Sequence, residues 1–198
     1  MKLSDGAIEG CDVFDSGSAV SSTGFTLGLG QCKGWADRWA RSVAKNGADV
    51  ALVVTGAWDV LDVHRADGTT LTFGTPAFDA AYLAQLQHGI DAVAATGAKV
   101  AFLEVACMRP VSAKGAATPP LPERGDDARV EHLSKLIRTA VSRNPSTTAF
   151  IDGPAEWCNG SPIATDLGYR WDGVHVYQPG ANLIYTKIAP QLLQLAAA

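Results

Sequence analysis

Three runs of apolar and β-branched residues predict strands that are buried on both faces of a sheet: residues 49–54, 99–105 and 147–152. Apolar residues at helical spacing predict four helices, which cover residues 35–44, 76–96, 126–143 and 181–196. A short strand is also expected at residues 3–8, whereas residues 11–33 and 60–75 read mainly as loop. Strands that alternate with helices of this length imply right-handed crossovers, so we predict a parallel sheet with helices on both faces.

The residues that could take part in catalysis or binding fall at one edge of this predicted sheet. Open α/β sheets bind ligands in the crevice beyond the carboxyl ends of their strands. That edge receives residues 56–59, the region of Cys107, Asp152, and the loop that carries Asp172 and His175. Residues 111–125 contain three prolines, and we expect them to form an exposed loop and a candidate lid over the site.

The stretch from Arg170 to His175 places an aspartate three residues before a histidine, with Gly173 between them. A carboxylate at this spacing can accept a hydrogen bond from one imidazole nitrogen, which leaves the other nitrogen free to take a proton from a hydroxyl nucleophile. A histidine in a loop is more often a surface or packing residue. The place of Asp172 and His175 after the last strand and before the closing helix favours a catalytic pair. The other histidines are interpreted as structural or solvated: His64, His88 and His132.

The composition narrows the classes of function. Apolar residues make up 47% of the 198 residues and charged residues 18%, as expected of a globular domain. The net charge of −4 comes without a basic stripe, which argues against a nucleic-acid partner. No apolar run suits a membrane span, no apolar signal core is visible at the N-terminus, and the spacing of the four cysteines does not suit zinc. The cysteines fit either two disulfides outside the cytoplasm or four buried thiols.

With these motifs in order, the sequence resembles the SGNH or GDSL-type hydrolases. More narrowly, it is similar to the SGNH domains fused to membrane acyltransferases that O-acylate cell-surface glycans. The resemblance covers nearly the whole chain and rests on four blocks: Gly10-Cys11, Cys32 followed by Trp35, residues 49–59 ending in Gly56-Ala57-Trp58-Asp59, and residues 170–175. It implies a single domain over residues 1–198 with a three-layer, flavodoxin-like α/β fold.

The resemblance also assigns roles to residues. His175 would be the base, Asp172 would orient it, and the backbone N–H of Gly10 would bind the oxyanion of an ester substrate. The pocket would be completed by Gly56, Trp58, Asp59 and Trp171. The same resemblance implies disulfides between Cys11 and Cys32 and between Cys107 and Cys158, and it implies no metal or cofactor.

Two features depart from the family pattern. Trp58 stands where the third block normally has an asparagine that donates to the oxyanion. The Gly-Asp-Ser turn that carries the nucleophile should precede the segment that ends at Gly10, so the chain is expected to be N-terminally incomplete. Ser16, in Phe14-Asp15-Ser16-Gly17, is the candidate substitute within this sequence, ahead of Ser4.

The expected function is therefore hydrolysis or transfer of an acyl group on a carbohydrate or lipid-like ester, in an extracytoplasmic location. The substrate would be a small-molecule or glycan ester, and relatives carry a tether to a membrane acyltransferase domain. The rival interpretation is a non-catalytic glycan- or acyl-binding module on the same fold. A nucleotide-binding domain is disfavoured because no glycine-rich phosphate loop follows a predicted strand.

Overall fold

A three-stranded parallel sheet forms the centre of the computed structural model, which describes residues 2–197. Its strands are β3 (Val50–Val53), β6 (Lys99–Leu103) and β7 (Thr148–Ile151), in the order β3-β6-β7. Phe102 on the middle strand is in register with Val53 on one side and Phe150 on the other. The predicted parallel α/β architecture is confirmed.

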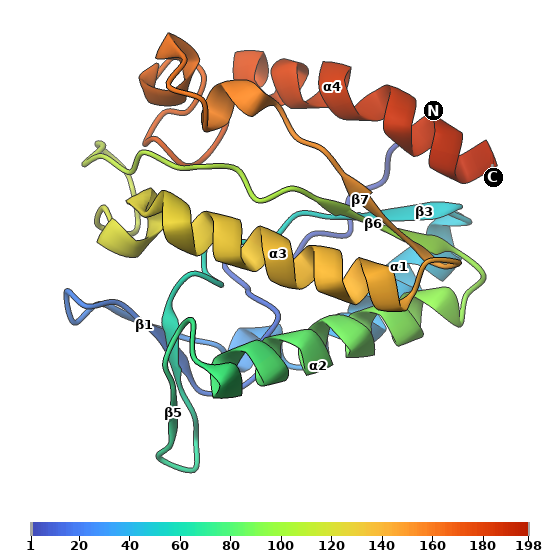
Figure 1. Cartoon of the computed structure of the whole chain (residues 1–198), viewed down its shortest axis with the longest axis horizontal. Coiled ribbons are helices and arrows are strands. Elements are labelled where there is room, and N and C mark those ends of the chain that lie inside the picture. The colour runs from blue at the N-terminus through green and yellow to red at the C-terminus, as the bar shows by residue number, and fades with distance from the viewer. Residues whose placement is uncertain (1, 198) are drawn as a thin grey trace.

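Helices cover the two faces of this sheet unequally. α1 (Trp35–Asn46), α2 (Pro76–Ala94) and α3 (Asp127–Arg143) lie on one face, and α4 (Gln178–Ala197) lies alone on the other (Figure 1). The main core fills the first face, whereas a small cluster joins α4 to the sheet through Ala101, Leu103, Ile151, Ile188 and Leu192. The result is the three-layer arrangement that the sequence predicts.

Local sequence signals explain where the helices on the first face begin and end. Thr75 caps α2 by accepting a hydrogen bond from the N–H of Phe78, and Pro76 occupies the first turn. Asp126 caps α3 in the same manner by accepting from the N–H of Ala128. α1 ends at Gly47, which takes the left-handed conformation at φ 57° that favours glycine.

A second, antiparallel sheet occupies segments that we expected to be loops. It consists of β1 (Ser18–Val20), β2 (Thr26–Gly28), β4 (Asp62–His64) and β5 (Thr70–Leu71), in the order β2-β1-β4-β5. Strands of two or three residues are too short to produce a detectable alternation of apolar and polar side chains. Ala19 and Val63 pair across β1 and β4 and are both buried, which ties this sheet to the main core.

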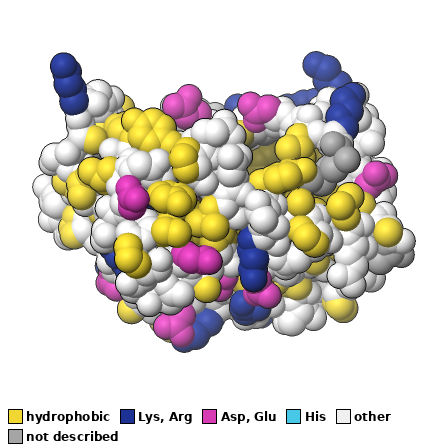
Figure 2. All heavy atoms as spheres, turned by 90° about the horizontal axis from the view of Figure 1, so that it is seen from above, with side chains coloured by type: hydrophobic (Ala, Val, Ile, Leu, Met, Phe, Trp, Pro, Cys, Tyr) yellow, Lys and Arg dark blue, Asp and Glu magenta, His cyan; other side chains and the backbone are white. Residues whose placement is uncertain are grey.

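The outer strand β3 is not buried on both faces, which corrects the sequence prediction. On the α4 side, Leu52 is 38% exposed and Val54, just beyond the strand, is 68% exposed. Within the described residues β3 pairs only with β6, and residues 3–8 form no strand, so the short strand expected there is wrong. A view from the α4 side shows apolar side chains gathered on this face around a hollow (Figure 2).

Both expected disulfides are present. Cys11 is joined to Cys32, and Cys107 is joined to Cys158, which links the segments that follow β6 and β7. Four 3-10 turns complete the described structure: η1 (Gly30–Cys32), η2 (Pro122–Gly125), η3 (Ala155–Trp157) and η4 (Pro162–Thr165). Two disulfides are typical of an extracytoplasmic protein. Among residues 2–197, no helix combines the length and the apolar character needed to cross a membrane.

Candidate active site

A tight turn between Arg170 and Val176 carries the predicted catalytic pair. Arg170 and Val176 form an antiparallel bridge, and the N–H of Trp171 donates to the carbonyl of His175 at 3.1 Å. Gly173 closes the turn at φ 78°, and its N–H donates to the carbonyl of Arg170 at 3.0 Å. A β-carbon at Gly173 would collide with the backbone carbonyl of Arg109, so only glycine fits this position without displacement.

Asp172 and His175 form a hydrogen-bonded dyad. The Nδ1 atom of His175 lies 2.7 Å from Oδ2 of Asp172. The other carboxylate oxygen, Oδ1, accepts from the backbone N–H groups of His175 at 2.7 Å and Val174 at 2.9 Å. Burial opposes ionisation of Asp172, but the hydrogen bonds from His175 and Val174 outweigh it, so the pKa of Asp172 lies below its usual value.

The two members of the dyad differ in exposure. Asp172 is 5% exposed, whereas the side chain of His175 is 59% exposed. Nε2 of His175 makes no hydrogen bond to any described residue, so it is free to exchange a proton with a ligand. Trp171 stacks beside the imidazole, with the ring centroids 5.6 Å apart and an interplanar angle of 18°. In the dyad, the carboxylate of Asp172 is fixed, the imidazole of His175 is oriented, and Nε2 has no hydrogen-bond partner among the described residues.

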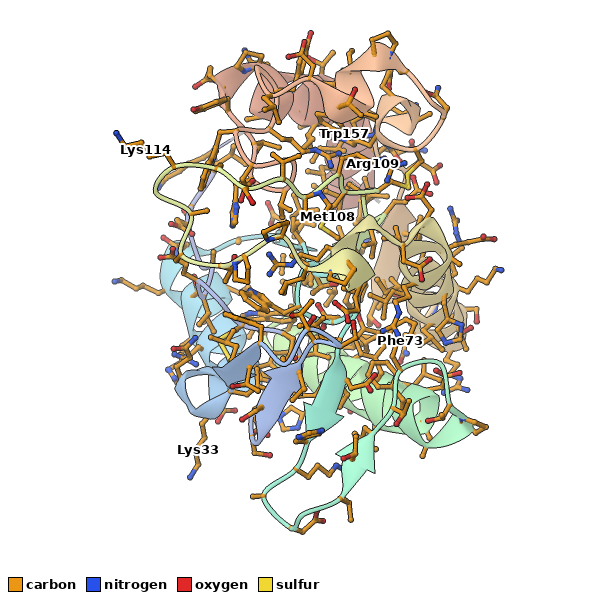
Figure 3. The ribbon with its side chains drawn as sticks, turned by 90° about the vertical axis from the view of Figure 1, so that its left-hand side faces the viewer. Lys33, Phe73, Met108, Arg109, Lys114 and Trp157 are labelled. Atoms are coloured by element: carbon orange, nitrogen blue, oxygen red, sulfur yellow. A yellow bond between two sulfur atoms is a disulfide. The ribbon has the colours of Figure 1, made fainter. Side chains whose placement is uncertain are left out.

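The segment after β6 holds this turn in place. The N–H of Arg109 donates to the carbonyl of Gly173, and the N–H of Val111 donates to the carbonyl of Asp172, both at 3.0 Å. The guanidinium of Arg170 donates to the carbonyl of Cys107 and lies 3.7 Å above the ring of Trp157. Met108, Arg109 and Trp157 lie in the same half of the molecule when it is viewed from the side, away from Phe73 near the antiparallel sheet (Figure 3).

The loop after β3 uses two of its predicted site residues for its own structure. Oδ2 of Asp59 accepts from the N–H of Gly56 at 2.7 Å, and Oδ1 accepts from the N–H of Val13 at 3.2 Å. Asp59 is 2% exposed, and Gly56 packs so closely against Val105 that no β-carbon would fit. The N–H of Gly56 and the carboxylate of Asp59 are therefore occupied within the loop.

A second buried carboxylate lies near Asp59. Asp12 is 5% exposed; one of its oxygens accepts from the N–H of Phe14, and the other has no partner among residues 2–197. Burial raises the pKa of Asp59 to about 6, although hydrogen bonds from Gly56 and Val13 act in the opposite direction. Burial and the charge of Asp59 together raise the pKa of Asp12 well above its usual value.

Trp58, on the same loop, contacts two groups. Its ring stacks with Phe25 at a centroid distance of 6.3 Å, and the guanidinium of Arg124 lies 4.1 Å from its centroid. Nε of Arg124 donates to the carbonyl of Ala57 at 2.6 Å. The charge of Asp172 also acts on Arg124. The next residue, Gly125, packs against Pro110, which in turn lies against Gly173 of the dyad's turn.

The segment that contains Arg124 corrects another prediction. The prediction of an exposed loop over residues 111–125 holds for residues 111–120, which are exposed or half-buried, but Leu121, Glu123 and Arg124 are all buried. The carboxylate of Glu123 accepts from Oγ of Ser21 at 2.8 Å and from the N–H of Ser22 at 2.7 Å, which fixes this end of the loop. The sequence does not point to Arg124, because an arginine in a proline-rich stretch carries no signal of burial.

No hydrogen bond among the described residues links Gly10 or Ser16 to the dyad. Gly10 adopts φ 70° next to the Cys11–Cys32 disulfide, and its carbonyl accepts from Gln31 at 3.2 Å. Ser16 is exposed and lines a hollow of about 340 Å³ whose walls include Arg65 and Gln85 but neither member of the dyad. Ser4 is exposed and lies outside any helix or strand. No hydrogen bond in the described chain joins a serine or threonine hydroxyl to His175.

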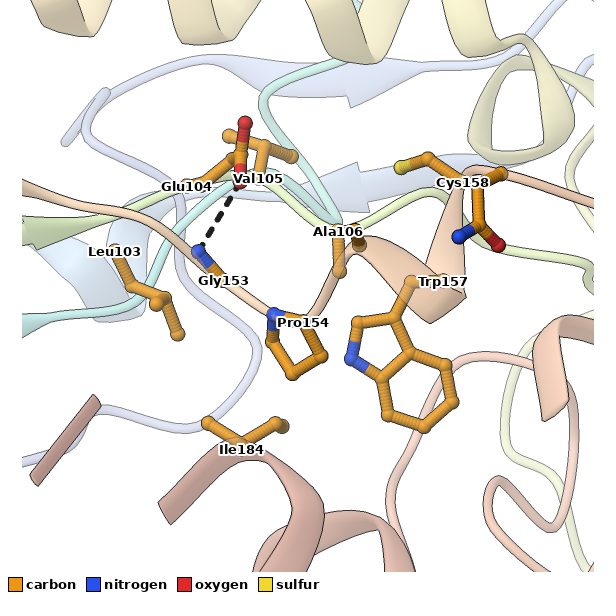
Figure 4. A pocket seen from close by; sticks show the side chains of 11 residues that line it. Leu103, Glu104, Val105, Ala106, Gly153, Pro154, Trp157, Cys158 and Ile184 are labelled. Atoms are coloured by element: carbon orange, nitrogen blue, oxygen red, sulfur yellow. Dashed lines mark hydrogen bonds between the residues drawn. The ribbon is translucent and has the colours of Figure 1, made fainter. Parts of the chain in front are cut away.

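An apolar cavity of about 270 Å³ lies at the carboxyl ends of β6 and β7 (Figure 4). Leu103, Pro154, Trp157 and Ile184 form its apolar walls, and Glu104 accepts from the N–H of Gly153 at 3.1 Å at its edge. Trp157 lines this cavity and also carries the stacked Arg170. The side chain of Trp157 therefore lies between the cavity and Arg170, which begins the turn that carries the dyad.

The described residues contain no group of three His, Cys, Asp or Glu side chains that could hold a metal ion. The chemistry that the arrangement offers is proton transfer at Nε2 of His175, beside two buried arginines, Arg124 and Arg170.

The three-layer fold with an Asp-x-x-His turn before the last helix is that of the SGNH or GDSL-type hydrolases. The chain belongs to the DUF459 family, whose model bears the description "Protein of unknown function" and matches residues 16–153. No curated protein sequence matches the chain.

Two solved structures from Bacteroides resemble this fold. One, assigned as an acylhydrolase of Bacteroides fragilis, is 15% identical with a TM-score of 0.57 over 82% of this chain and 69% of its own. The other is a GDSL-like lipase of Bacteroides thetaiotaomicron, 15% identical with a TM-score of 0.55 over 81% of this chain and 69% of its own. At this identity the likeness shows the fold alone.

Proposed function

We propose that this protein is an SGNH-type ester hydrolase or O-acyltransferase that acts on acylated carbohydrates or lipid-like esters. The observation that carries the proposal is the dyad, in which Asp172 fixes one imidazole nitrogen of His175 and leaves Nε2 free. In this mechanism Nε2 takes the proton of a hydroxyl nucleophile as its oxygen bonds to the ester carbonyl carbon. The same nitrogen then returns the proton to the leaving alcohol.

The surroundings of the dyad suit an ester substrate. Trp171 stacks beside His175, and Tyr177, two residues further along the chain, is exposed; aromatic faces of this kind pack well against sugar rings. The cavity lined by Trp157 and Ile184 has room for a short acyl chain. Acyl transfer of this type uses a nucleophile, a base and oxyanion donors, so the proposal requires no cofactor.

The proposal is tested by hydrolysis of p-nitrophenyl acetate and by labelling with a fluorophosphonate. We expect the wild-type protein to be active and His175→Ala to lose about 10³-fold or more in kcat. Ser16→Ala distinguishes the nucleophile: loss of labelling would identify Ser16, and retention would place the nucleophile elsewhere. Activity that survives His175→Ala in a correctly folded variant would contradict the proposed mechanism.

A second candidate is a non-catalytic glycan- or acyl-binding module on the same fold. It is favoured by the absence, within residues 2–197, of a serine or threonine hydroxyl hydrogen-bonded to His175. This candidate predicts no hydrolysis and no fluorophosphonate labelling, together with saturable binding of an acetylated oligosaccharide that Trp171→Ala weakens. Hydrolysis by the wild-type protein that requires His175 would exclude it.

A further inference from the structure

Arg124 is a buried cation whose hydrogen-bonding capacity is mostly unused. The residue is only 2% exposed, and its single hydrogen bond runs from Nε to the carbonyl of Ala57. A guanidinium carries five N–H donors, so the donors on the two terminal nitrogens remain. Those nitrogens make no hydrogen bond or ion pair with the described residues. These donors reach the surface of an otherwise buried side chain, so they are open to a partner from outside the chain.

The position of Arg124 relates it to the dyad. Its guanidinium stacks 4.1 Å from the centroid of Trp58, and this contact fixes the plane of the donors. Burial lowers the pKa of Arg124 to about 10, and the negative charge of Asp172 acts against this shift. Arg124 is therefore cationic at neutral pH. The next residue, Gly125, packs against Pro110, which also lies against Gly173 in the turn between Asp172 and His175.

The charges around the dyad leave an excess of positive charge. The charge of Arg109 is neutralised by a bidentate ion pair with Asp127, in which the two terminal nitrogens lie 2.6 and 2.8 Å from the carboxylate oxygens. Arg170 is buried and directs its guanidinium to the carbonyl of Cys107. Two buried guanidiniums, those of Arg124 and Arg170, thus interact with the charge of one buried carboxylate, that of Asp172. A ligand that brings one negatively charged oxygen would balance the group.

We propose that the terminal N–H groups of Arg124 bind a negatively charged oxygen of the ligand that occupies this site. Such an oxygen can come from a fixed carboxylate or phosphate on the ligand, or from the carbonyl of an ester under attack. The slight exposure of Arg124 suits a contact with a single oxygen, which favours the carbonyl oxygen of an ester under attack.

The assignment to an ester carbonyl oxygen rests on the proposed function. As the nucleophile's oxygen bonds to the carbonyl carbon, its proton passes to Nε2 of His175, and the carbonyl π electrons move onto the oxygen. Arg124 keeps all its protons and stabilises that charge. It would thus supply a donor on the side of the site where Trp58 replaces the family's asparagine.

The binding arm of the test does not depend on catalysis. Isothermal titration with acetate and inorganic phosphate, with neutral acetamide as the reference, is performed on wild type, Arg124→Gln and Arg129→Gln. Arg129 is the matched control because it also stacks on an aromatic ring, that of Phe73, and donates to a backbone carbonyl, that of Val60. We expect at least a tenfold loss of anion affinity in Arg124→Gln and less than a twofold change in Arg129→Gln.

A spectroscopic measurement on the wild-type protein keeps the test decisive if Arg124→Gln does not fold. The ¹⁵N resonance of Arg124 Nε, assigned by its disappearance in Arg124→Lys, should shift as acetate or phosphate is added. An unshifted resonance at saturating anion, or anion affinity in folded Arg124→Gln equal to that of wild type, would overturn the proposal.

The kinetic arm separates the two sources of the anion. If Arg124 stabilises the oxyanion, Arg124→Gln should lower kcat for the neutral ester p-nitrophenyl acetate by about 10²- to 10³-fold. If it binds a fixed anion, the variant should raise KM for p-nitrophenyl hemisuccinate and leave p-nitrophenyl acetate unaffected. If the wild-type protein hydrolyses neither ester but binds anions through Arg124, the hydrolase proposal is refuted and the anion site is supported. If it hydrolyses an ester and Arg124→Gln changes neither hydrolysis nor anion binding, the hydrolase proposal is supported and the anion site is refuted.

Discussion

The backbone of Gly173 lies directly against the carbonyl oxygen of Arg109, and the two residues are also joined by a hydrogen bond of 3.0 Å from the N–H of Arg109 to the carbonyl of Gly173. This contact places the turn between Asp172 and His175 on the segment that follows β6. The orientation of the dyad therefore depends on the absence of a side chain at residue 173.

Gly173→Ala should destabilise the protein and disturb the dyad. The new β-carbon would both collide with Arg109 and be strained at φ 78°. We expect a loss of about 3 kcal/mol or more in the free energy of unfolding, measured by urea denaturation. Gly160→Ala is the matched control, because Gly160 has φ 77° with no atom near the added β-carbon. A Gly173→Ala variant as stable as Gly160→Ala would show that the close contact is unimportant.

Asp172→Asn should lower the stability of the protein more at neutral pH than at acid pH. The folded-state pKa of Asp172 is lowered, so its ionised form stabilises the fold above the unfolded-state pKa of about 4. That contribution disappears as the pH falls through the folded-state pKa. The difference in Tm between variant and wild type should therefore be largest near pH 7 and should shrink below about pH 4. Asp166→Asn, at an exposed aspartate in the preceding loop, should show a much smaller difference.

Asp12→Asn should have the opposite effect and stabilise the protein at neutral pH. The pKa values of Asp12 and Asp59 are both raised, that of Asp59 to about 6, so folding favours the protonated forms. Stability from such groups is complete below the unfolded-state pKa of about 4 and is lost as the pH rises through the folded-state values. The asparagine can still accept from the N–H of Phe14 while removing one of two like charges.

Thermal unfolding between pH 4 and pH 8 checks this prediction. We expect Asp12→Asn to raise Tm at pH 7.5 by about 2–4 °C, which corresponds to roughly 1 kcal/mol in a protein of this size. The fall of Tm with increasing pH should also be less steep than in wild type. Asp49→Asn, at an exposed carboxylate, should leave the profile unchanged. A lower Tm for Asp12→Asn at pH 7.5 would contradict the assignment of a strained carboxylate pair.

The two disulfides should contribute unequally to stability. They span 21 and 51 residues of sequence, and the chain-entropy relation gives about 3 kcal/mol for the shorter loop and about 4 kcal/mol for the longer one. Replacing Cys107 and Cys158 by alanine should therefore lower the midpoint of urea denaturation more than replacing Cys11 and Cys32. Removal of the 107–158 bridge should also loosen Arg170, which donates to the carbonyl of Cys107. The reverse order of stabilities would show that local strain outweighs loop length.

The α/β framework could be predicted because its elements carry long patterns. Phe78, Tyr82, Leu86 and Ile90 repeat at helical spacing and are all buried in α2. The strand pairs of the antiparallel sheet could not be predicted in this way, because two or three residues do not establish a period. The exposure of Leu52 and Val54 was missed for another reason: an apolar strand looks the same at the edge of a sheet as at its centre.

The order of the main strands and helices and the Asp172–His175 pair can be predicted from the sequence alone, since a hydrogen bond between residues three apart depends only on the local turn. The surroundings of that pair depend on how the chain packs. Asp59 is turned inward by the N–H groups of Val13 and Gly56, and Arg124 is buried against Trp58, far away in sequence. Burial and the supply of hydrogen-bond partners are properties of the packed chain. They decide which charged side chains hold the loops together and which have donors left for a ligand.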